Sequence, residues 1–307
     1  MIEAQALSKR YGDKTAVDGV TFAVKPGVVT GFLGPNGAGK STTIRMIMGL
    51  DAPTAGSVTV NGKAYARHPA PLSEVGALLE ARAVHTGRSA YHHLLALALT
   101  TGIGRKRVDE VLEMVGLTDV AHKRVGGFSL GMGQRLGVAA ALLGDPATLV
   151  LDEPVNGLDP QGILWIRTLL RRLAAEGRTV FVSSHLMSEM ALTADHLVVI
   201  GRGRVIADAS VSEFIDRASA RVVRVRTPQA AELRARLTGP GIDVTSNAPD
   251  LLEVHGLDSA AVGLVACRAA IPLEELAPVQ ASLEEAFMEL TDDALEYRVH
   301  ETEQRAS

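Results

Sequence analysis

The octapeptide GPNGAGKS, residues 34–41, constrains the fold of this chain more than any other stretch. It fits the pattern G-x-x-x-x-G-K-[ST], in which glycines let the backbone curl so that successive N–H groups point inward at a phosphate. The apolar run VVTGFLG (28–34) predicts a buried strand before it, and STTIRMIMGL (41–50) has apolar residues at helical spacing after it. A strand, a glycine loop and a helix make a βα unit, so we expect a phosphate-binding loop in an α/β fold.

Each residue type in this octapeptide has a physical task. The helix that begins near Lys40 directs its positive end at the phosphates. The Lys40 ammonium is expected to reach the β- and γ-phosphates of a nucleoside triphosphate, and the Ser41 hydroxyl to bind Mg²⁺. The predicted nucleotide-binding residues are Gly34, Pro35, Asn36, Gly37, Ala38, Gly39, Lys40, Ser41 and Thr42.

Two carboxylates end a second predicted buried strand, TLVLDEP (148–154). Asp152 falls at the carboxyl end of this strand, where parallel α/β sheets bind their ligands. Mg²⁺ needs more oxygen ligands than one hydroxyl, so Asp152 is expected to hold it directly or through water. Glu153 is then placed to accept a proton from the attacking water as a general base. The alternative is a buried strand that ends in a solvated acidic turn.

A histidine follows a third predicted strand, TVFVSSH (179–185). Because this strand belongs to the same expected sheet, His185 would lie at the same edge as the phosphate loop and donate a hydrogen bond to the γ-phosphate. The alternative is a purely structural histidine.

The order of elements along the chain predicts two domains. In residues 1–215, strands alternate with helices, which indicates a largely parallel sheet covered on both faces. Residues 86–145 are expected to be mostly helical, and GSVTVNGKAY (56–65) is expected to form a hairpin that turns at Asn61-Gly62. Residues 218–307 form the second predicted domain, a small α+β unit with the order β-α-β-β-α-β of a ferredoxin-like fold, followed by a final helix in ASLEEAFMELTDD.

Composition and charge narrow the class of protein. The chain is 47% hydrophobic and 21% charged, as soluble globular proteins are, and it has no uncharged apolar run of 18 residues and no signal peptide. Residues 1–205 hold 22 of the 31 basic and 17 of the 35 acidic residues, so the rest of the chain is acidic, which argues against binding to nucleic acid. The single cysteine, Cys267, is expected to be a small core residue, and we expect a cytoplasmic location.

Several motifs occur together in a characteristic order, namely GPNGAGKS, FSLGMGQR, LVLDEP, NGLDP and SSH. With this order and spacing, residues 2–215 resemble the ATP-binding subunit of an ABC transporter. The segments SLGMGQR and SLEEAFMELT resemble the drug and antibiotic exporter ATPases that pair with ABC-2 type permeases, and EARAVHTGRSAYHHLLALA resembles actinobacterial members of that group.

The resemblance implies ATP as the nucleotide and roles for five further positions. Tyr11 matches the aromatic residue that stacks on adenine, and the alternative is a half-exposed strand tyrosine. Ser129 and Gly131 match the signature loop, Asp159 the loop after the carboxylates, and His185 the switch histidine. In this family two copies meet head to tail, and each ATP is held by the phosphate loop of one copy and the signature helix of the other.

Two positions depart from the family pattern. Glu80 stands where a glutamine is usual, so it is expected either to ligate Mg²⁺ or its water, or to point into solvent. Met132 stands where many members have glutamine, and a thioether is a poor hydrogen-bond acceptor. The contribution of the glutamine amide is therefore either absent from this chain or supplied by another residue, for which Gln134 is the candidate.

The resemblance implies an ATPase subunit of a homodimeric, ATP- and Mg²⁺-dependent transporter, bound to the cytoplasmic face of the membrane through a separate ABC-2 type permease that exports drugs or antibiotics. Two alternatives remain open. One is a soluble ABC ATPase without a permease, and the other is the ATPase of an importer. A non-catalytic regulator would lack Asp152, Glu153 or His185, all of which are present.

Overall fold

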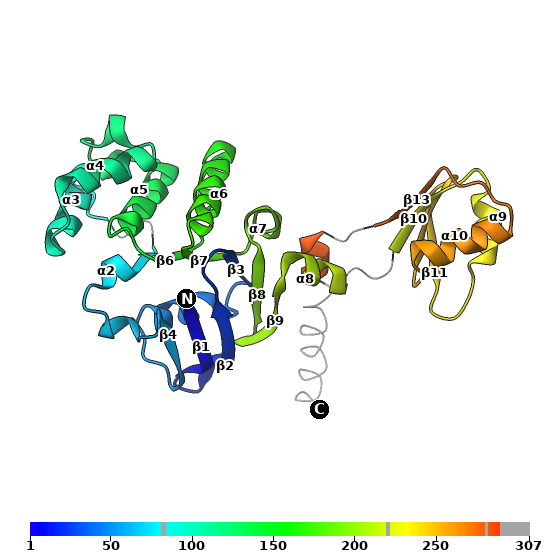
Figure 1. The fold of residues 1–307 in the computed structure, drawn as a ribbon, viewed down its shortest axis with the longest axis horizontal. Coiled ribbons are helices and arrows are strands. Elements are labelled where there is room, and N and C mark those ends of the chain that lie inside the picture. The colour runs from blue at the N-terminus through cyan, green and yellow to red at the C-terminus, as the bar shows by residue number, and fades with distance from the viewer. Residues whose placement is uncertain (81–83, 219–221, 280–281, 289–307) are drawn as a thin grey trace, which may run out of the picture. The chain divides into compact units, whose positions relative to one another are not determined.

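A computed structural model describes residues 1–80, 84–218, 222–279 and 282–288 (Figure 1). The chain divides into two compact units, Met1–Val211 and Ser212–Ser307. No helix in the described ranges combines the length and the apolar composition needed to cross a bilayer.

A six-stranded sheet with the order β5-β6-β7-β3-β8-β9 organises the first unit. Its strands are β3 (Val29–Leu33), β5 (Val75–Leu78), β6 (Thr148–Asp152), β7 (Thr179–Ser184), β8 (His196–Gly201) and β9 (Arg204–Ser210). All pairs are parallel except β8 with β9, which are antiparallel. Every residue of β3 and β7 is buried, which is expected for central strands that are covered on both faces. The prediction of a mainly parallel sheet is confirmed.

A second, antiparallel sheet has the order β2-β1-β4. It consists of β1 (Ile2–Tyr11), β2 (Lys14–Val24) and β4 (Ala55–Val60). Three phenylalanines join the two sheets in one core, because Phe22 of β2 lies 5.7 Å from the rings of both Phe32 and Phe181 in the parallel sheet. The phosphate loop contacts both sheets, since Gly39 lies against Ala16 of β2 and Gly34 against Ile200 of β8.

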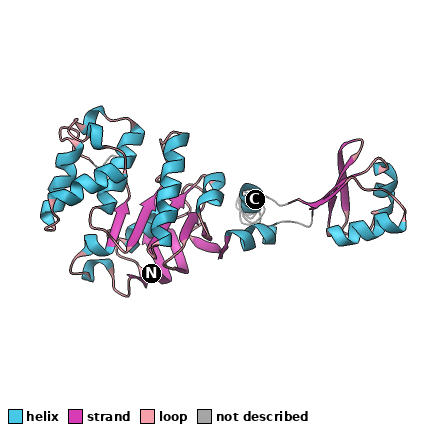
Figure 2. Ribbon diagram, turned by 45° about the horizontal axis from the view of Figure 1, so that its top comes forward, coloured by secondary structure: helices cyan, strands magenta, loops and turns pink. Residues whose placement is uncertain are grey.

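Helices cover the parallel sheet and form a separate layer, as Figure 2 shows. They are α1 (Lys40–Ile47), α2 (Pro71–Glu74), α3 (Ala90–Thr100), α4 (Arg105–Met114), α5 (Leu130–Leu142), α6 (Pro160–Ala175) and α7 (Met187–Thr193), with 3₁₀ turns at Tyr65–Arg67, Thr118–Val120 and Val125–Gly127. Helix α8 (Val211–Ala218) begins at the last residue of this unit and belongs mainly to the second unit. Helices α3, α4 and α5 contact one another, so the predicted helical subdomain is present (Figure 1).

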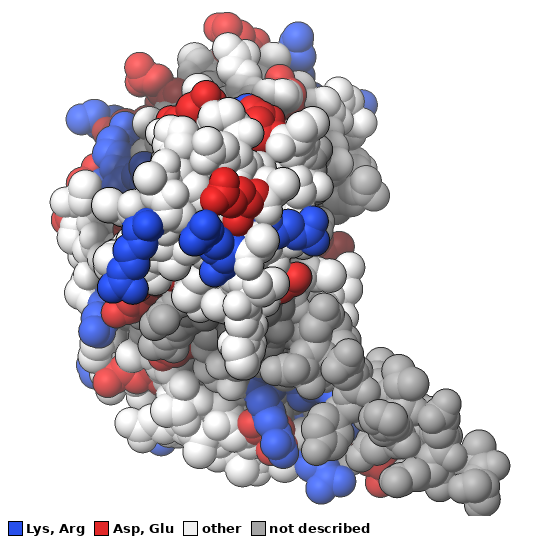
Figure 3. Space-filling view, turned by 90° about the vertical axis from the view of Figure 1, so that its right-hand side faces the viewer, with Lys and Arg blue, Asp and Glu red and all other residues white. Residues whose placement is uncertain are grey.

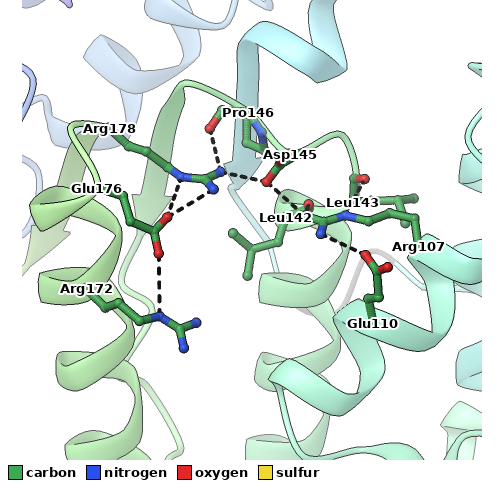
Figure 4. A network of polar contacts seen from close by, with 9 residues as sticks. All are labelled: Arg107, Glu110, Leu142, Leu143, Asp145, Pro146, Arg172, Glu176 and Arg178. Carbon is green, nitrogen blue, oxygen red and sulfur yellow. Dashed lines mark hydrogen bonds and ion pairs between the residues drawn. The ribbon is translucent and has the colours of Figure 1, made fainter.

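A polar network fastens this helical layer to the parallel sheet (Figure 4). Arg107 of α4 donates to the Leu142 carbonyl at 2.8 Å and to Asp145 at 3.1 Å. Arg178, just before β7, donates to the same Asp145 carboxylate at 2.9 Å and to the Pro146 carbonyl at 3.1 Å. One carboxylate therefore links the helical layer to the sheet at the end of α5.

The second unit contains the predicted β-α-β-β-α-β order. Its elements are β10 (Val222–Arg226), α9 (Ala230–Arg236), β11 (Asp243–Ala248), β12 (Leu251–His255), α10 (Ser259–Arg268) and β13 (Glu275–Pro278). The antiparallel strand order β11-β12-β10-β13 is that of a ferredoxin-like sheet. Arg226 pairs with Asp250 at 2.6 Å across this unit, and on the face drawn in Figure 3 basic and acidic side chains lie among one another rather than in separate fields.

Three expectations change in detail. Residues 56–65 turn at Asn61-Gly62, both at positive φ, but the return strand is reduced to a single bridge between Val60 and Lys63, and β4 pairs with β1 instead. Cys267 is exposed on α10 and is not a core residue, because the neighbouring Ala266 occupies the buried face. The final helix spans 283–288, and the rest of the predicted segment lies outside the described residues.

Candidate active site

The phosphate loop joins β3 to α1 and is shaped by close backbone contacts. A Cβ on Gly34 would lie 2.3 Å from the Ile200 carbonyl oxygen, and one on Gly39 would lie 2.7 Å from that of Ala16. Gly39 is the N-cap of α1 at φ 108°, where no side chain caps the helix. The first N–H groups of α1 are therefore left to an anionic ligand.

Lys40 lies inside this loop with only 6% of its surface exposed. Its Nζ donates to the Gly34 carbonyl at 2.6 Å and to the Pro35 carbonyl at 3.3 Å. Burial lowers the pKa of Lys40, and the negative charges of Glu153 and Asp152 act in the opposite direction. The ammonium thus lies within electrostatic reach of both carboxylates that the sequence singled out.

Strands β6 and β7 bring the predicted carboxylates beside a serine. Their register pairs Asp152 with Ser183, which is fully buried. The Ser183 hydroxyl donates a short hydrogen bond to Asp152 Oδ1 and accepts one from the Glu153 N–H at 3.0 Å. Ser183 was not identified from the sequence, although it lies only two residues before His185. Its role follows from the strand register, which pairs it with Asp152.

Glu153 and His185 come together at the ends of these two strands. His185 Nδ1 lies 2.8 Å from Glu153 Oε2, and the side chains are 43% and 20% exposed. Glu153 adopts φ 51°, in the left-handed region that residues with side chains rarely occupy. A partly exposed carboxylate in contact with an imidazole is suited to accept a proton from water and pass it on.

Tyr11 is 48% exposed at the end of β1. Its hydroxyl donates to Asp51 Oδ2 at 2.8 Å, and Arg45 Nε donates to the same oxygen at 2.8 Å. The hydrogen bond to Asp51 raises the pKa of Tyr11, and one with the Thr42 side chain opposes it. Tyr11 therefore lies beside the start of α1. Asp51 was not expected here, because nothing in DAPTAG shows that it folds back onto β1.

Two of the residues that the resemblance assigns to the second ATP site, Ser129 and Asp159, cap their own helices. Ser129 is the exposed N-cap of α5, and its hydroxyl accepts from the Met132 N–H at 3.2 Å. Gly131 lies against the turn that precedes α6, since a Cβ there would be 3.2 Å from the Gly157 carbonyl oxygen. Asp159 is the N-cap of α6 and accepts from the Gly162 N–H at 2.8 Å. Both helix ends are therefore formed before any partner arrives.

The two departures have different surroundings. Glu80 is exposed, two residues beyond β5, at the sheet edge where β6 ends in Asp152. Met132 is half-buried in the first turn of α5. Gln134 cannot replace a polar group at that helix end, because it is only 4% exposed and its amide donates to the Glu153 carbonyl of the same chain at 3.1 Å.

The oxygen ligands available for Mg²⁺ are suited to a metal ion that is bound together with the phosphates of a nucleotide. Within the described ranges, no group of three or more His, Cys, Asp or Glu side chains is arranged to hold a metal. The Asp152 carboxylate and the Ser41 hydroxyl are oxygen ligands of the kind that Mg²⁺ accepts, and Mg²⁺ commonly binds through one or two protein groups plus substrate phosphates. The fit is thus to a metal–nucleotide complex and not to a free-standing metal site.

Comparison with known proteins gives a consistent result. A family model described as ABC transporter matches residues 17–156, and a model described as a domain of unknown function (DUF8746) matches residues 221–284. The chain is 36% identical over 312 residues to the ABC transporter ATP-binding protein YhcH of Bacillus subtilis (strain 168), with 98% of this chain and 99% of that protein covered.

Two further relatives are informative. The bacitracin transport ATP-binding protein BcrA of Bacillus licheniformis is 44% identical over 211 residues, which cover 68% of this chain and 69% of BcrA. A dimeric structure of a post-hydrolysis state of the ATP-binding cassette MJ0796, bound to ADP and Pi, superposes with a TM-score of 0.63 at 25% identity, and covers 69% of this chain and 99% of that one.

Proposed function

The chain belongs to the ATP-binding proteins of ABC transporters and is an ATPase subunit, and we propose that two copies of it enclose two ATP molecules head to tail and drive a separate membrane permease. In this proposal residues 1–215 are the ATP-binding domain and residues 218–307 an accessory domain. The one observation that carries the proposed chemistry is the 2.8 Å contact between Glu153 and His185 beside the phosphate loop.

Each residue of the site then has a definite task. Lys40 and the loop amides bind the phosphates and stabilise the charge that develops on them, which supplies most of the catalysis in phosphoryl transfer. Bound Mg²⁺, held through Ser41 and Asp152, would neutralise charge on the β- and γ-phosphates. Glu153 takes the proton of the attacking water, and His185 orients that carboxylate and the γ-phosphate. Tyr11 stacks on adenine.

The second half of each site would come from the other copy. The N-terminus of α5 carries the exposed Ser129 and the Gly131 amide at a positive helix end. These groups suit the γ-phosphate of an ATP held by the partner. Asp159 would contact the partner from the loop before α6. The solved relative MJ0796 is described as a dimer, which supports this arrangement.

The partner and cargo follow from the relatives. BcrA is described as a bacitracin transport protein. Relatives described as lantibiotic transport and linearmycin resistance ATP-binding proteins are 36% and 38% identical to this chain. We therefore propose export of a drug- or antibiotic-like compound through an ABC-2 type permease, with this subunit at the cytoplasmic face of the membrane. An importer or a soluble ATPase would have different partners.

Two measurements test the proposal. Glu153→Gln removes the base and leaves the phosphate loop intact, so this variant should bind MgATP and accumulate as a dimer in sedimentation velocity. A variant that hydrolyses ATP at the parent rate would exclude Glu153 as the base. Copurification from the native membrane with a protein of about six apolar spans would support the permease, whereas a stable association with ribosomes or DNA would contradict it.

A further inference from the structure

Gln134 is a buried polar residue that the proposed chemistry does not use. It lies on α5, four residues after the start of the helix, and only 4% of its surface is exposed. Its amide nitrogen donates to the backbone carbonyl of Glu153 at 3.1 Å. Buried polar side chains are costly unless they are hydrogen-bonded, so this bond fixes the position of both partners.

The Glu153 peptide that receives this bond is held from several sides. Its N–H donates to the Ser183 hydroxyl at 3.0 Å and to the Ser183 carbonyl at 3.3 Å. Its carbonyl also accepts from the Asn156 N–H at 3.2 Å, which closes a turn with Pro154 at the second position. The residue thereby keeps φ 51°, a conformation that persists only where the surroundings over-determine it.

This backbone conformation decides where the Glu153 carboxylate lies. The carbonyl carbon is bonded to the same Cα that carries the side chain, so a displacement of this carbonyl moves Cα and shifts the carboxylate relative to His185, which it now meets at 2.8 Å. Catalytic groups displaced by about 1 Å lose up to two orders of magnitude in rate. A donor that holds this peptide therefore bears directly on hydrolysis without touching the nucleotide.

The helix that carries Gln134 touches the same segment at a second place. The Leu130 side chain packs on Gly157, where a Cβ would be 2.1 Å from Leu130 Cδ2. Both ends of the segment from Glu153 to Gly157 therefore contact α5. A shift of α5 would displace this segment with it.

We propose that Gln134 is a positioning residue for Glu153, and that it ties the base of one ATP site to the helix end that the same subunit offers to the other site. This inference rests on the proposed function, because the N-terminus of α5 meets an ATP only in the head-to-tail dimer. In that dimer the N-terminus of α5 meets the partner's ATP, and Gln134 conveys the position of α5 to Glu153 in its own subunit.

The test compares substitutions at two buried positions of one helix in the full chain. Gln134→Met keeps the length of the side chain and removes the donor, whereas Gln134→Glu keeps the shape and places an acceptor against the carbonyl. Val138→Ala is the matched control, because Val138 is 1% exposed on α5 and loses packing volume without any bond to Glu153. Steady-state ATPase rates, the ATP concentration at half-maximal rate and thermal midpoints are measured for all variants.

Both Gln134 variants should lower kcat about tenfold to a hundredfold, with the half-maximal ATP concentration within about twofold of the parent. Val138→Ala should lower the thermal midpoint and leave kcat within about twofold. In a Glu153→Gln background, Gln134→Met should leave the ATP-dependent dimer intact, because Gln134 does not touch nucleotide.

Three results would overturn the proposal. The first is a parent-like kcat in Gln134→Met, and the second is loss of the dimer in the double variant. The third is a kcat that falls with the thermal midpoint by the same relation in Val138→Ala and in Gln134→Met, because loss of stability would then explain both. If the parent chain itself hydrolyses no ATP with or without its permease, the proposed function fails, and this inference fails with it. If the parent hydrolyses ATP and the Gln134 variants are equally active, this inference is refuted and the proposed function stands.

Discussion

Two helix N-termini in the first unit present backbone N–H groups, and they differ in what their own chain supplies. Helix α1 begins at Gly39, which has no capping side chain, and Lys40 beside it is 6% exposed. Helix α5 begins at Ser129, which is exposed and caps the helix with its own hydroxyl. The first end is surrounded by a complete phosphate loop, whereas the second has no basic residue in its first turn and faces outward.

This difference supports the proposal that two copies of the chain act together. A phosphate needs several donors and a positive charge, which the loop at α1 provides with Lys40 and its amides. The end of α5 offers donors without a cation, so it is suited to complete a site that another copy has already begun.

The largest effect is expected at Lys40. Lys40→Met removes the cation that is buried among the loop carbonyls, so nucleotide binding should be lost and kcat/KM should fall by about three orders of magnitude. Fluorescent nucleotide titration and phosphate release measure both. Lys63→Met is the matched control, because Lys63 is exposed in the same unit, and it should retain parental values. Tight binding by Lys40→Met would mean that the loop does not hold the phosphates.

A large but different effect is expected at Ser129. Ser129→Arg places a bulky cation at the outward-facing helix end, so it should reduce the rate of ATP hydrolysis at least a hundredfold, while the dissociation constant of ATP for the monomer stays within about twofold of the parent. Ser129→Ala is the milder companion, since it removes the cap at a cost of about 1 kcal/mol in stability without obstructing the surface. If Ser129→Arg also prevents ATP binding by the monomer, the N-terminus of α5 contributes to the ATP site of its own chain, which contradicts the separate roles of the two helix ends.

The smallest effect is expected at Tyr11. Tyr11→Ala removes a stacking ring worth about 0.5–1.5 kcal/mol, so the ATP concentration at half-maximal rate should rise about twofold to twelvefold with kcat unchanged. Tyr11→Phe keeps the ring and loses the bond to Asp51. Its ATP concentration at half-maximal rate should lie between the values of the parent and of Tyr11→Ala. An unchanged half-maximal concentration in Tyr11→Ala would show that this ring does not meet the base.

The fold was predictable where short stretches decide it. GPNGAGKS and the strands before Asp152 and His185 are local patterns, and the parallel sheet brings their ends to one edge as expected. The ferredoxin-like order of the second unit was predictable for the same reason, because each of its elements has its own periodicity.

What escaped prediction depends on contacts between distant segments. Gln134 and Glu153 are far apart in sequence, and only the packing of α5 against the end of β6 joins them. Ser183 takes its role from the register of β6 with β7, and Asp51 from a turn that returns to β1. The exposure of Cys267 likewise depends on which face of α10 meets the sheet. None of these follows from the spacing of residue types.

Mixing two inactive variants tests whether each ATP site is shared between two copies of the chain. Glu153→Gln removes the base beside the phosphate loop, and Ser129→Arg blocks the helix end offered to the partner. A mixed dimer has one site with both defects and one intact site. Equal mixing makes half of the dimers mixed, so the ATPase rate should recover to about a quarter of the parental rate, with dimers verified by sedimentation velocity in MgATP. A mixture whose dimers form but whose rate stays at the mean of the two variants would contradict the shared site.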